Sequence, residues 1–192
     1  MNKLRNLIQV LNELPGIGKK SATRLAIKLI EEKNISIKTL GETIDKLNGL
    51  DIDDKTGLII EDGQTIYNIG KPLMIVQNNL DAEAYRELFI NQFNFFNLEI
   101  NTIADISRTL LKEDKIKTLI DFIKEKEIKE IIFGLSPKRE SEIITTLISN
   151  EIHSNLLDVK ISKIATGVPI GGSIEHIDSN TIRRAVEKRE KI

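Results

Sequence analysis

Cysteine is absent from this chain of 192 residues. Its absence excludes disulfides, thiolate zinc sites, iron–sulfur clusters and a cysteine nucleophile. Histidine is almost as scarce: His153 and His176 are the only two, and neither lies in a triad-like or metal-ligating pattern with other residues. We therefore expect no metal site built from thiolate or histidine ligands, no cofactor, and no catalytic cysteine or histidine.

Long apolar runs are missing as well. No stretch of about 18 apolar residues occurs, so the sequence predicts no membrane span and no membrane partner. The first residues, MNKLRNLIQVLNEL, are charged and amphipathic and lack the apolar core of a secretory signal. With 40% hydrophobic and 30% charged residues the chain can bury a core. We expect a soluble, cytoplasmic protein.

Charge is unevenly spread along the chain, whose formal net charge is −1. Residues 1–30 carry +5 and residues 179–192 carry +3, which leaves −9 for residues 31–178. This excludes a uniformly basic nucleic-acid coat protein, but the basic ends suit contact with a polyanion. The alternative is that the lysine-rich helices are simply solvated.

The first 50 residues predict a small helical unit. Apolar residues recur with helical spacing over residues 4–11, 19–32 and 36–47. Between the first two helices, Pro15-Gly16-Ile17-Gly18 favours a tight turn. A unit this small is expected to depend on a neighbour for stability.

Residues 58–67 predict a β-hairpin. The β-prone runs 58–61 and 64–67 flank Asp62-Gly63, a strong signal for a two-residue turn.

Strands and helices alternate from residue 73 onward. Strands are expected at 73–76, 98–103, 131–133 and 159–165, and helices at 81–90, 115–126 and 140–150. This alternation predicts an α/β fold with a mostly parallel sheet covered by helices. A last helix begins near Ser179 with Ile182, Ala185 and Val186 on its apolar side, and is too short to persist in water without a partner.

The turn from Leu14 to Ala22 is the first motif with chemical content. Its glycines, Gly16 and Gly18, let a ligand approach the backbone, and the N–H groups that open the next helix suit a phosphate. Lys19 and Lys20 add positive charge, and Arg24 lies one turn beyond Lys20. We interpret these residues as a DNA-phosphate contact that does not read bases. An ordinary helical hairpin is the alternative.

Two other phosphate-binding motifs do not fit this turn. A dinucleotide fingerprint needs a strand before its glycines, and a helix is expected here. A P-loop needs a glycine at the position of Glu13 and a single lysine between its last glycine and a Ser or Thr. Here two lysines, Lys19 and Lys20, separate Gly18 from Ser21.

The second motif runs from Thr166 to Asp178 and, taken alone, is a Gly/Pro-rich connection after a strand. Together with the first motif it resembles the RecR family of recombination mediators. That family has a helix–hairpin–helix, a four-cysteine zinc module, a Toprim α/β domain and a segment of the pattern Gly-Val-Pro-x-Gly-Gly-x-Leu-Glu-Tyr-x-Asp. Residues 167–178 match this pattern with Ile174 for Leu and His176 for Tyr, and Thr181, Ile182 and Arg189 resemble the family's closing helix.

The resemblance implies four parts. Residues 1–52 would form a helix–hairpin–helix DNA-binding unit, and residues 53–71 a degenerate zinc-module hairpin. Residues 72–166 would form a Toprim-like α/β domain. Residues 167–192 would form a Gly-rich segment with an oligomerisation helix that docks on a partner.

The chain departs from the family in the zinc module, which would lie near residues 50–70, where no cysteine stands. A metal-free variant of the module is implied, in which Ile59, Ile66 and Ile69 replace the metal by a small apolar contact.

A second departure concerns catalysis. Catalytic Toprim enzymes resemble one another in a Glu after the first strand and a later Asp-x-Asp, which hold Mg²⁺. Gln77 and Gly134-Leu135-Ser136 occupy those places here, and an amide does not supply the anionic ligand that Mg²⁺ favours.

Glu140 and Glu142 form a carboxylate pair at the start of a predicted helix. In the family the matching acidic segment is implicated in docking RecO, so the resemblance makes both residues candidates for a partner site. Compensation of the helix dipole explains the pair equally well.

By resemblance, the chain is a non-enzymatic DNA-repair mediator. It would join RecO, and in some organisms RecF, to help RecA load on single-stranded DNA covered by SSB. Family members form dimeric or tetrameric rings that can encircle DNA, so a homo-oligomer is expected. Two alternatives stay open: an active Toprim nuclease or primase-like enzyme, and a protein adaptor that does not touch DNA.

Overall fold

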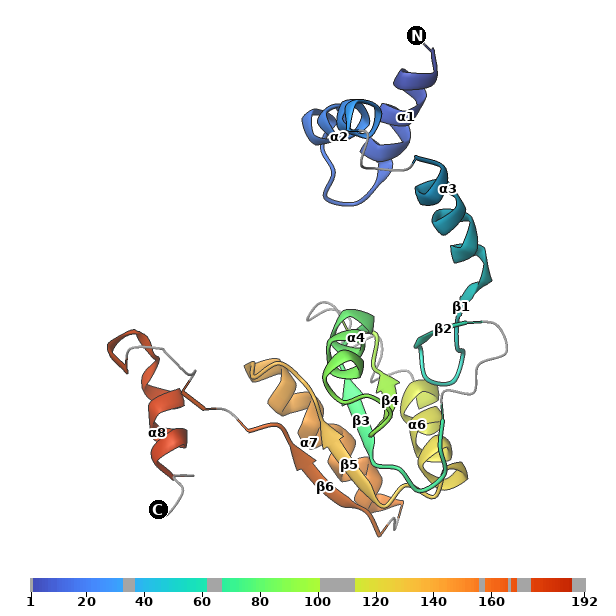
Figure 1. The fold of residues 1–192 in the computed structure, drawn as a ribbon. Coiled ribbons are helices and arrows are strands. Elements are labelled where there is room, and N and C mark those ends of the chain that lie inside the picture. Colours follow the sequence, from blue (N-terminus) through green and yellow to red (C-terminus); the bar gives the residue numbers. More distant parts are fainter. Residues whose placement is uncertain are drawn as a thin grey trace. The chain divides into compact units, whose positions relative to one another are not determined.

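A computed structural model describes residues 2–32, 37–61, 67–100, 113–155, 158–165, 167–168 and 174–187. The chain forms two compact units, residues 1–50 and 51–192, which are described separately (Figure 1). None of the helices in the described ranges is long and apolar enough to cross a lipid bilayer.

The first unit is helical. Helices α1 (Asn2–Glu13) and α2 (Lys19–Glu31) pack on each other, and α3 (Ile37–Lys46) continues into a short 3-10 helix, η1 (Leu47–Gly49). Ala22 and Ala26 are four residues apart on one face of α2 and fully buried, so their small side chains let the helices approach closely. The three helices predicted for this region are confirmed.

A small hairpin opens the second unit. Strands β1 (Leu50–Ile52) and β2 (Ile59–Glu61) pair with each other. The predicted hairpin instead paired 58–61 with 64–67. The structure gives β2 a different partner, and residues 62–66 lie outside the described ranges. The turn that forms is closed by Asp53 and Gly57, where the N–H of Gly57 donates to the Asp53 carbonyl over 2.7 Å.

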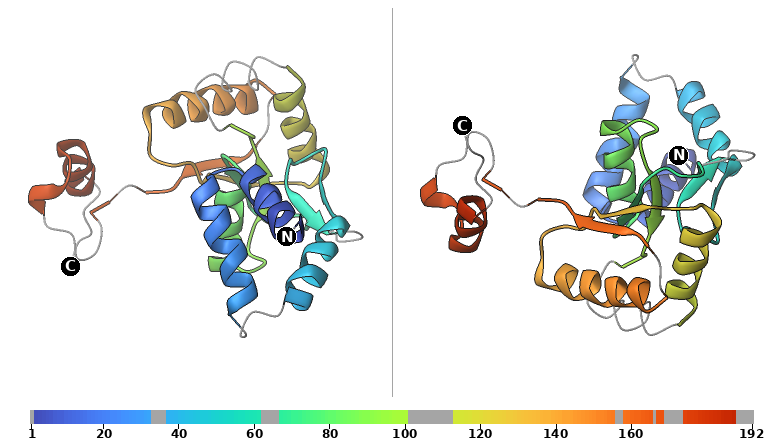
Figure 2. Two further views of the ribbon diagram at one scale, coloured as in Figure 1. Left: turned by 90° about the horizontal axis from the view of Figure 1, so that it is seen from above. Right: turned by 90° about the horizontal axis from the view of Figure 1, so that it is seen from below.

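A four-stranded parallel sheet forms the body of this unit. Strands β3 (Leu73–Val76), β4 (Asn94–Asn97), β5 (Glu130–Phe133) and β6 (Lys160–Lys163) lie in the order β4-β3-β5-β6. Helix α4 (Asn79–Leu88) covers one face, and α6 (Glu113–Glu125) and α7 (Arg139–Ser154) cover the other (Figure 2). The predicted α/β fold with a parallel sheet is confirmed.

The side chains of β3 point alternately to the two faces of the sheet and so belong to two separate core clusters. Leu73 and Ile75 belong to a large cluster with apolar residues of α6 and α7. Met74 and Val76 point to the other face and pack with Ala82 of α4. All four strand residues are buried, as the continuous apolar run predicted.

The strand predicted at 98–103 is wrong in position: the strand is β4, which ends at Asn97. Asparagine is depleted in strands, so the pattern did not indicate one here. Asn94 and Asn97 are nevertheless buried because their amides bond to backbone groups of the preceding segment. Glu99, with φ 57, turns the chain away after the strand.

The last described segment holds η2 (Ile174–His176) and α8 (Ser179–Glu187). Asp178 caps α8, because its Oδ1 accepts from the N–H groups of Asn180 and Thr181, both at 3.0 Å. Ile182 and Ala185 are half-buried, and Val186 is 57% exposed within a single chain. Thr166, the stretch 169–173 and Arg189 lie outside the described residues.

Candidate nucleic-acid interface

The turn between α1 and α2 has a defined backbone. The N–H of Ile17 donates to the carbonyl of Leu14 over 3.1 Å, and Gly16 has φ 80, in the left-handed region that favours glycine. Ile17 is half-buried, whereas Leu14 and Pro15 are exposed. The turn is therefore anchored by Ile17 and leads directly into the first residue of α2.

The start of α2 is bare of side-chain caps. Gly18 is the N-cap residue, with φ −75 and ψ 163, and no side chain bonds to the cap. The first N–H groups of a helix have no acceptor within the helix. No acidic residue lies in the first turn of α2, so nothing there neutralises the positive end of the helix dipole.

The space beside the two glycines is open. A Cβ built on Gly16 or on Gly18 would meet no heavy atom within 4 Å. The φ of Gly16 favours glycine, but the backbone of Gly18 is one that any residue adopts. The fold therefore does not require glycine at position 18, and its effect is to leave the N–H groups of α2 accessible to a ligand.

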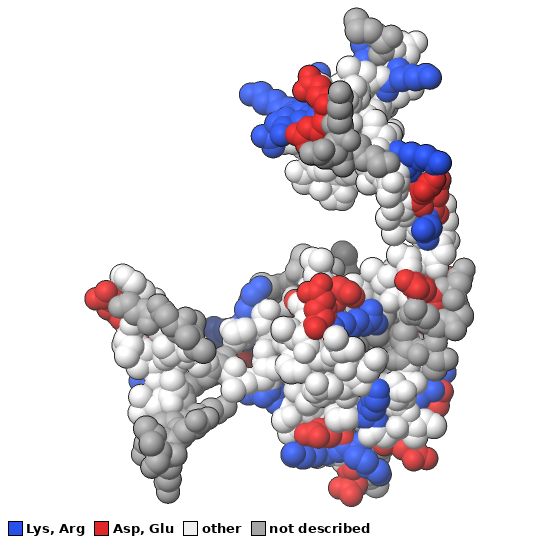
Figure 3. All heavy atoms as spheres, in the orientation of Figure 1, with Lys and Arg blue, Asp and Glu red and all other residues white. Residues whose placement is uncertain are grey.

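Three cations surround this turn. Lys19, Lys20 and Arg24 are exposed, and none of them pairs with an acidic residue in the described part of the chain. Lys28, further along α2, differs because it pairs with Glu32 at 3.0 Å. Figure 3 shows Lys and Arg side chains projecting from the first unit. The structure thus places the five predicted contact residues together at the turn and the start of α2.

The acidic pair is placed on α7. Glu140 and Glu142 lie in the first turn of that helix, and Glu142 Oε2 accepts from Lys163 Nζ of β6 at 2.6 Å. This ion pair joins the helix to the edge strand of the sheet. Glu142 therefore has an intramolecular role, while Glu140 is half-buried at the same helix end.

The carboxyl edge of the sheet presents one acid beside β3. Gln77 follows β3, Gly134-Leu135-Ser136 follows β5, and the acid is Asp81 in the first turn of α4. Burial raises the pKa of Asp81 above its usual value, although the charge of Lys138 opposes the shift. Across the described ranges no three His, Cys, Asp or Glu side chains gather as metal ligands. In the part of the chain that the structure describes, this edge therefore shows no gathered set of the anionic oxygens that Mg²⁺ favours.

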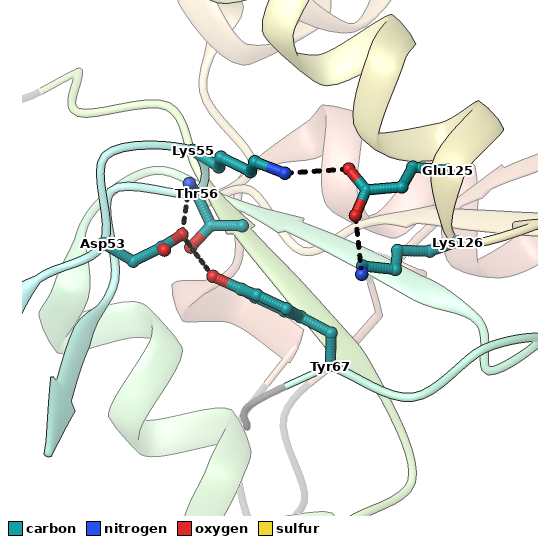
Figure 4. A network of polar contacts seen from close by, with 6 residues as sticks. All are labelled: Asp53, Lys55, Thr56, Tyr67, Glu125 and Lys126. Atoms are coloured by element: carbon teal, nitrogen blue, oxygen red, sulfur yellow. Dashed lines mark hydrogen bonds and ion pairs between the residues drawn. The ribbon is translucent and has the colours of Figure 1, made fainter. Parts of the chain in front are cut away.

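Residues 53–70 hold the contacts that the sequence patterns missed. The predicted apolar contact is wrong for Ile59 and Ile69, which are 45% and 71% exposed, and Ile66 lies outside the described residues. A polar cluster of Asp53, Thr56 and Tyr67 stands there instead (Figure 4). The signal that could have found it is Asp-x-x-Thr-Gly at 53–57, a pattern typical of a side-chain-bonded turn.

Known proteins match the chain at both ends and over its length. Residues 4–47 match the model of the RecR helix-hairpin-helix, and residues 167–190 match that of the RecR C-terminal region. The protein named Recombination protein RecR from Syntrophomonas wolfei is 30% identical over 199 residues, covering 98% of this chain and 97% of that protein. Its namesake from Saccharophagus degradans is 30% identical over 194 residues, covering 97% and 96%.

The chain belongs to the RecR family. Its helix-hairpin-helix match spans α1, α2 and α3, and so contains the uncapped turn. Its C-terminal match begins at Gly167 and includes η2 and α8. The RecR relatives also align through the cysteine-free segment between these two regions.

Proposed function

We propose that this RecR-family chain is a DNA repair and recombination mediator that binds DNA. With RecO, and in some organisms RecF, it would promote loading of RecA on single-stranded DNA covered by SSB. The names of its relatives support the recombination role. The observation that carries the DNA-binding proposal is the uncapped, acid-free start of α2 beside two open glycines.

The chemistry of this turn suits a phosphate. Backbone N–H groups and the helix dipole attract an anion at the start of α2. Lys19, Lys20 and Arg24 supply charge that no described acid neutralises. None of these groups distinguishes one base from another, so the contact would follow the DNA backbone without reading sequence.

A homo-oligomeric ring is the proposed assembly. Helix α3 carries Ile37, Leu40 and Ile44 with helical spacing, Leu47 follows at the start of η1, and all four side chains are exposed. An apolar stripe of this kind is typical of an interaction surface. A second copy of the chain that covered it would gather several basic turns around one DNA molecule.

We also propose that the chain has no catalytic activity of its own. Gln77 and Gly134-Leu135-Ser136 at the carboxyl edge support this, since the parallel sheet is consistent with a Toprim-like domain but lacks its acidic ligands there. Glu140 is the better remaining candidate for a RecO contact, because Glu142 is paired with Lys163.

DNA binding by the full chain tests the proposal. Fluorescence anisotropy with labelled single- and double-stranded oligonucleotides, over a series of salt concentrations, should show a logarithm of affinity that falls linearly with the logarithm of salt. Unrelated sequences should bind equally. Binding that is absent at low salt would favour the protein adaptor, and Mg²⁺-dependent cleavage of the DNA would favour the enzyme.

A further inference from the structure

The segment 50–70 does not offer the ligands of the family's zinc module. Zinc in structural sites takes four thiolate or imidazole ligands, and the chain has no cysteine. Its two histidines lie elsewhere: His153 is on α7 with Nδ1 2.7 Å from the Ser149 carbonyl, and His176 is in η2. The residues present therefore do not fit zinc, and something else must hold this segment in place.

A cluster of oxygen groups occupies the segment. Asp53 Oδ2 accepts from the Thr56 N–H at 2.8 Å and from Thr56 Oγ1 at 2.6 Å. The hydroxyl of Tyr67 bonds to Asp53 as well and lies 3.4 Å from Thr56 Oγ1. Thr56 is fully buried. These contacts join the turn after β1 to the chain that enters β3, between residues 11 positions apart.

The cluster is in turn attached to α6. The ring of Tyr67 meets that of Phe122 edge-on at 5.1 Å between centroids, and Lys126 Nζ lies 5.4 Å from the Tyr67 ring centroid. Glu125 accepts from both Lys55 and Lys126 at 2.9 Å (Figure 4). The turn and Tyr67 therefore both reach the same end of one helix.

Buried amides fix the remaining backbone of the segment. The side chain of Asn94 exchanges two 2.8 Å bonds with the backbone of Asn68. The Gly57 carbonyl accepts from the amides of Asn79 at 3.1 Å and Asn97 at 2.8 Å. Both arms of the segment are thus bonded to the sheet as well as to each other.

We propose that Asp53, Thr56 and Tyr67 form a metal-free clasp that crosslinks the two arms of this segment, the task for which the zinc module of the family uses an ion. The clasp works as a crosslink does, by closing a loop that is then no longer free to open. It is independent of the DNA-binding proposal, because none of its residues lies in the first unit.

Amide hydrogen exchange in the full chain tests the clasp. Tyr67→Phe removes one hydroxyl and keeps the ring on Phe122, so the protein should fold. The amide of Thr56 should then exchange roughly fivefold to tenfold faster, the effect of one lost hydrogen bond on local opening. Tyr85→Phe is the matched control, because Tyr85 is also half-buried but its hydroxyl has no hydrogen bond to a described residue.

A second variant and a metal arm complete the experiment. Thr56→Val should speed exchange at Gly57, and the double variant should fall short of the product of the single effects, since both act through Asp53. Purified protein should hold far less than one zinc per chain, with exchange unchanged by a chelator. Two results would contradict the proposal. One is an exchange rate at the Thr56 amide that does not change in Tyr67→Phe. The other is about one zinc per chain together with exchange that a chelator accelerates.

Discussion

The side-chain amide of Asn97 donates to the backbone carbonyl of Gly57 over 2.8 Å, across 40 positions of the chain. Asn97 Oδ1 also accepts from the N–H of Glu99 at 2.8 Å, so both ends of the amide are used. Gly57 has φ 67, and a Cβ there would stand 2.9 Å from a Glu99 oxygen. One buried amide therefore joins the end of β4 to a turn whose backbone favours glycine.

Replacing Asn97 with Ala should destabilise the second unit by about 2–4 kcal/mol, because two buried hydrogen bonds are lost and a backbone carbonyl keeps one partner fewer. Urea denaturation measures the change. Asn150→Ala on the exposed side of α7 is the control and should change stability by less than about 0.5 kcal/mol. Equal stability of the two variants would show that the amide does not hold the turn.

Lys20 and Arg24 are expected to contact DNA phosphates. Replacing both with Ala should weaken binding uniformly across DNA sequences and flatten the salt slope by roughly one to two units. Stability should change little, because both side chains are exposed. Lys117→Ala with Lys124→Ala on α6 removes the same charge elsewhere and should have the smaller effect. An unchanged slope in the α2 variant would remove the turn from the DNA site.

The two glycines of the turn should respond differently to alanine. Gly16→Ala forces a φ of 80 on a residue with a side chain and should destabilise the first unit by roughly 1 kcal/mol. Gly18→Ala meets no atom and should fold normally, but its methyl group would stand where a phosphate approaches. Thermal melts should therefore show only a small loss of stability for Gly18→Ala, since alanine is a poorer N-cap than glycine, and anisotropy should show weaker DNA binding. Full DNA affinity in that variant would argue against close approach at position 18.

Periodicity predicted most of the elements because their buried residues repeat along single helices and strands. Leu73–Val76 is buried as one continuous apolar run, and α7 buries Ile144, Ile148 and Ile152 at a spacing of four residues. β4 has no such pattern, since Asn94 and Asn97 are buried against backbone partners that lie 26 and 40 positions away in the chain. Such burial depends on tertiary partners that a local pattern does not contain.

The same distinction between local pattern and distant partners holds for the candidate site. The sequence placed Gly16, Gly18 and the cations at one turn, and the structure places them there too, because the whole motif is local. The open space at Gly18 and the pairing of Glu142 with Lys163 are visible only in the three-dimensional structure. Lys163 lies 21 positions after Glu142, so no spacing rule for a helix relates them.

Asp53 should make stability depend on acid pH. Burial alone raises its pKa, but the hydrogen bonds from Thr56 and Tyr67 outweigh burial and hold the pKa below its usual value of 3.8. A carboxyl whose pKa is lower in the folded state stabilises the fold above the unfolded value, and this contribution is lost as pH falls through the folded pKa. Between about pH 5 and pH 2, wild-type stability should therefore fall more steeply than that of Asp53→Asn.

Glu125 provides the control for the pH dependence expected of Asp53, because its pKa is also lowered. Lys126 and Lys55 lower its pKa to about 2, but the side chain lies at the surface, so its ion pairs are screened and contribute little. Glu125→Gln should leave the pH profile of stability close to that of wild type. Superimposable profiles for wild type and Asp53→Asn would show that the Asp53 contacts do not persist in solution.

Deleting residues 179–192 should lower the oligomeric state and, with it, the affinity for DNA. The segment contains α8, whose Val186 is 57% exposed and whose Ile182 and Ala185 are half-buried. An apolar stripe left in water costs free energy, and a helix this short has no independent stability, so it is expected to dock. If it docks on a second copy, its loss separates subunits, and a multivalent contact with DNA loses affinity by orders of magnitude.

A shorter deletion distinguishes the effect of losing α8 from the effect of losing the basic residues that follow it. Removing residues 188–192 takes away basic residues but leaves α8 and its Asp178 cap in place, so the oligomer should survive. The mass of each folded truncation, measured by sedimentation, shows whether α8 docks on a second copy of the chain or on its own unit. If α8 packed on its own unit instead, the longer deletion would lower the melting temperature while the surviving folded protein kept its full oligomeric mass. A reduced mass for the longer deletion alone is the result that identifies α8 as the contact between subunits.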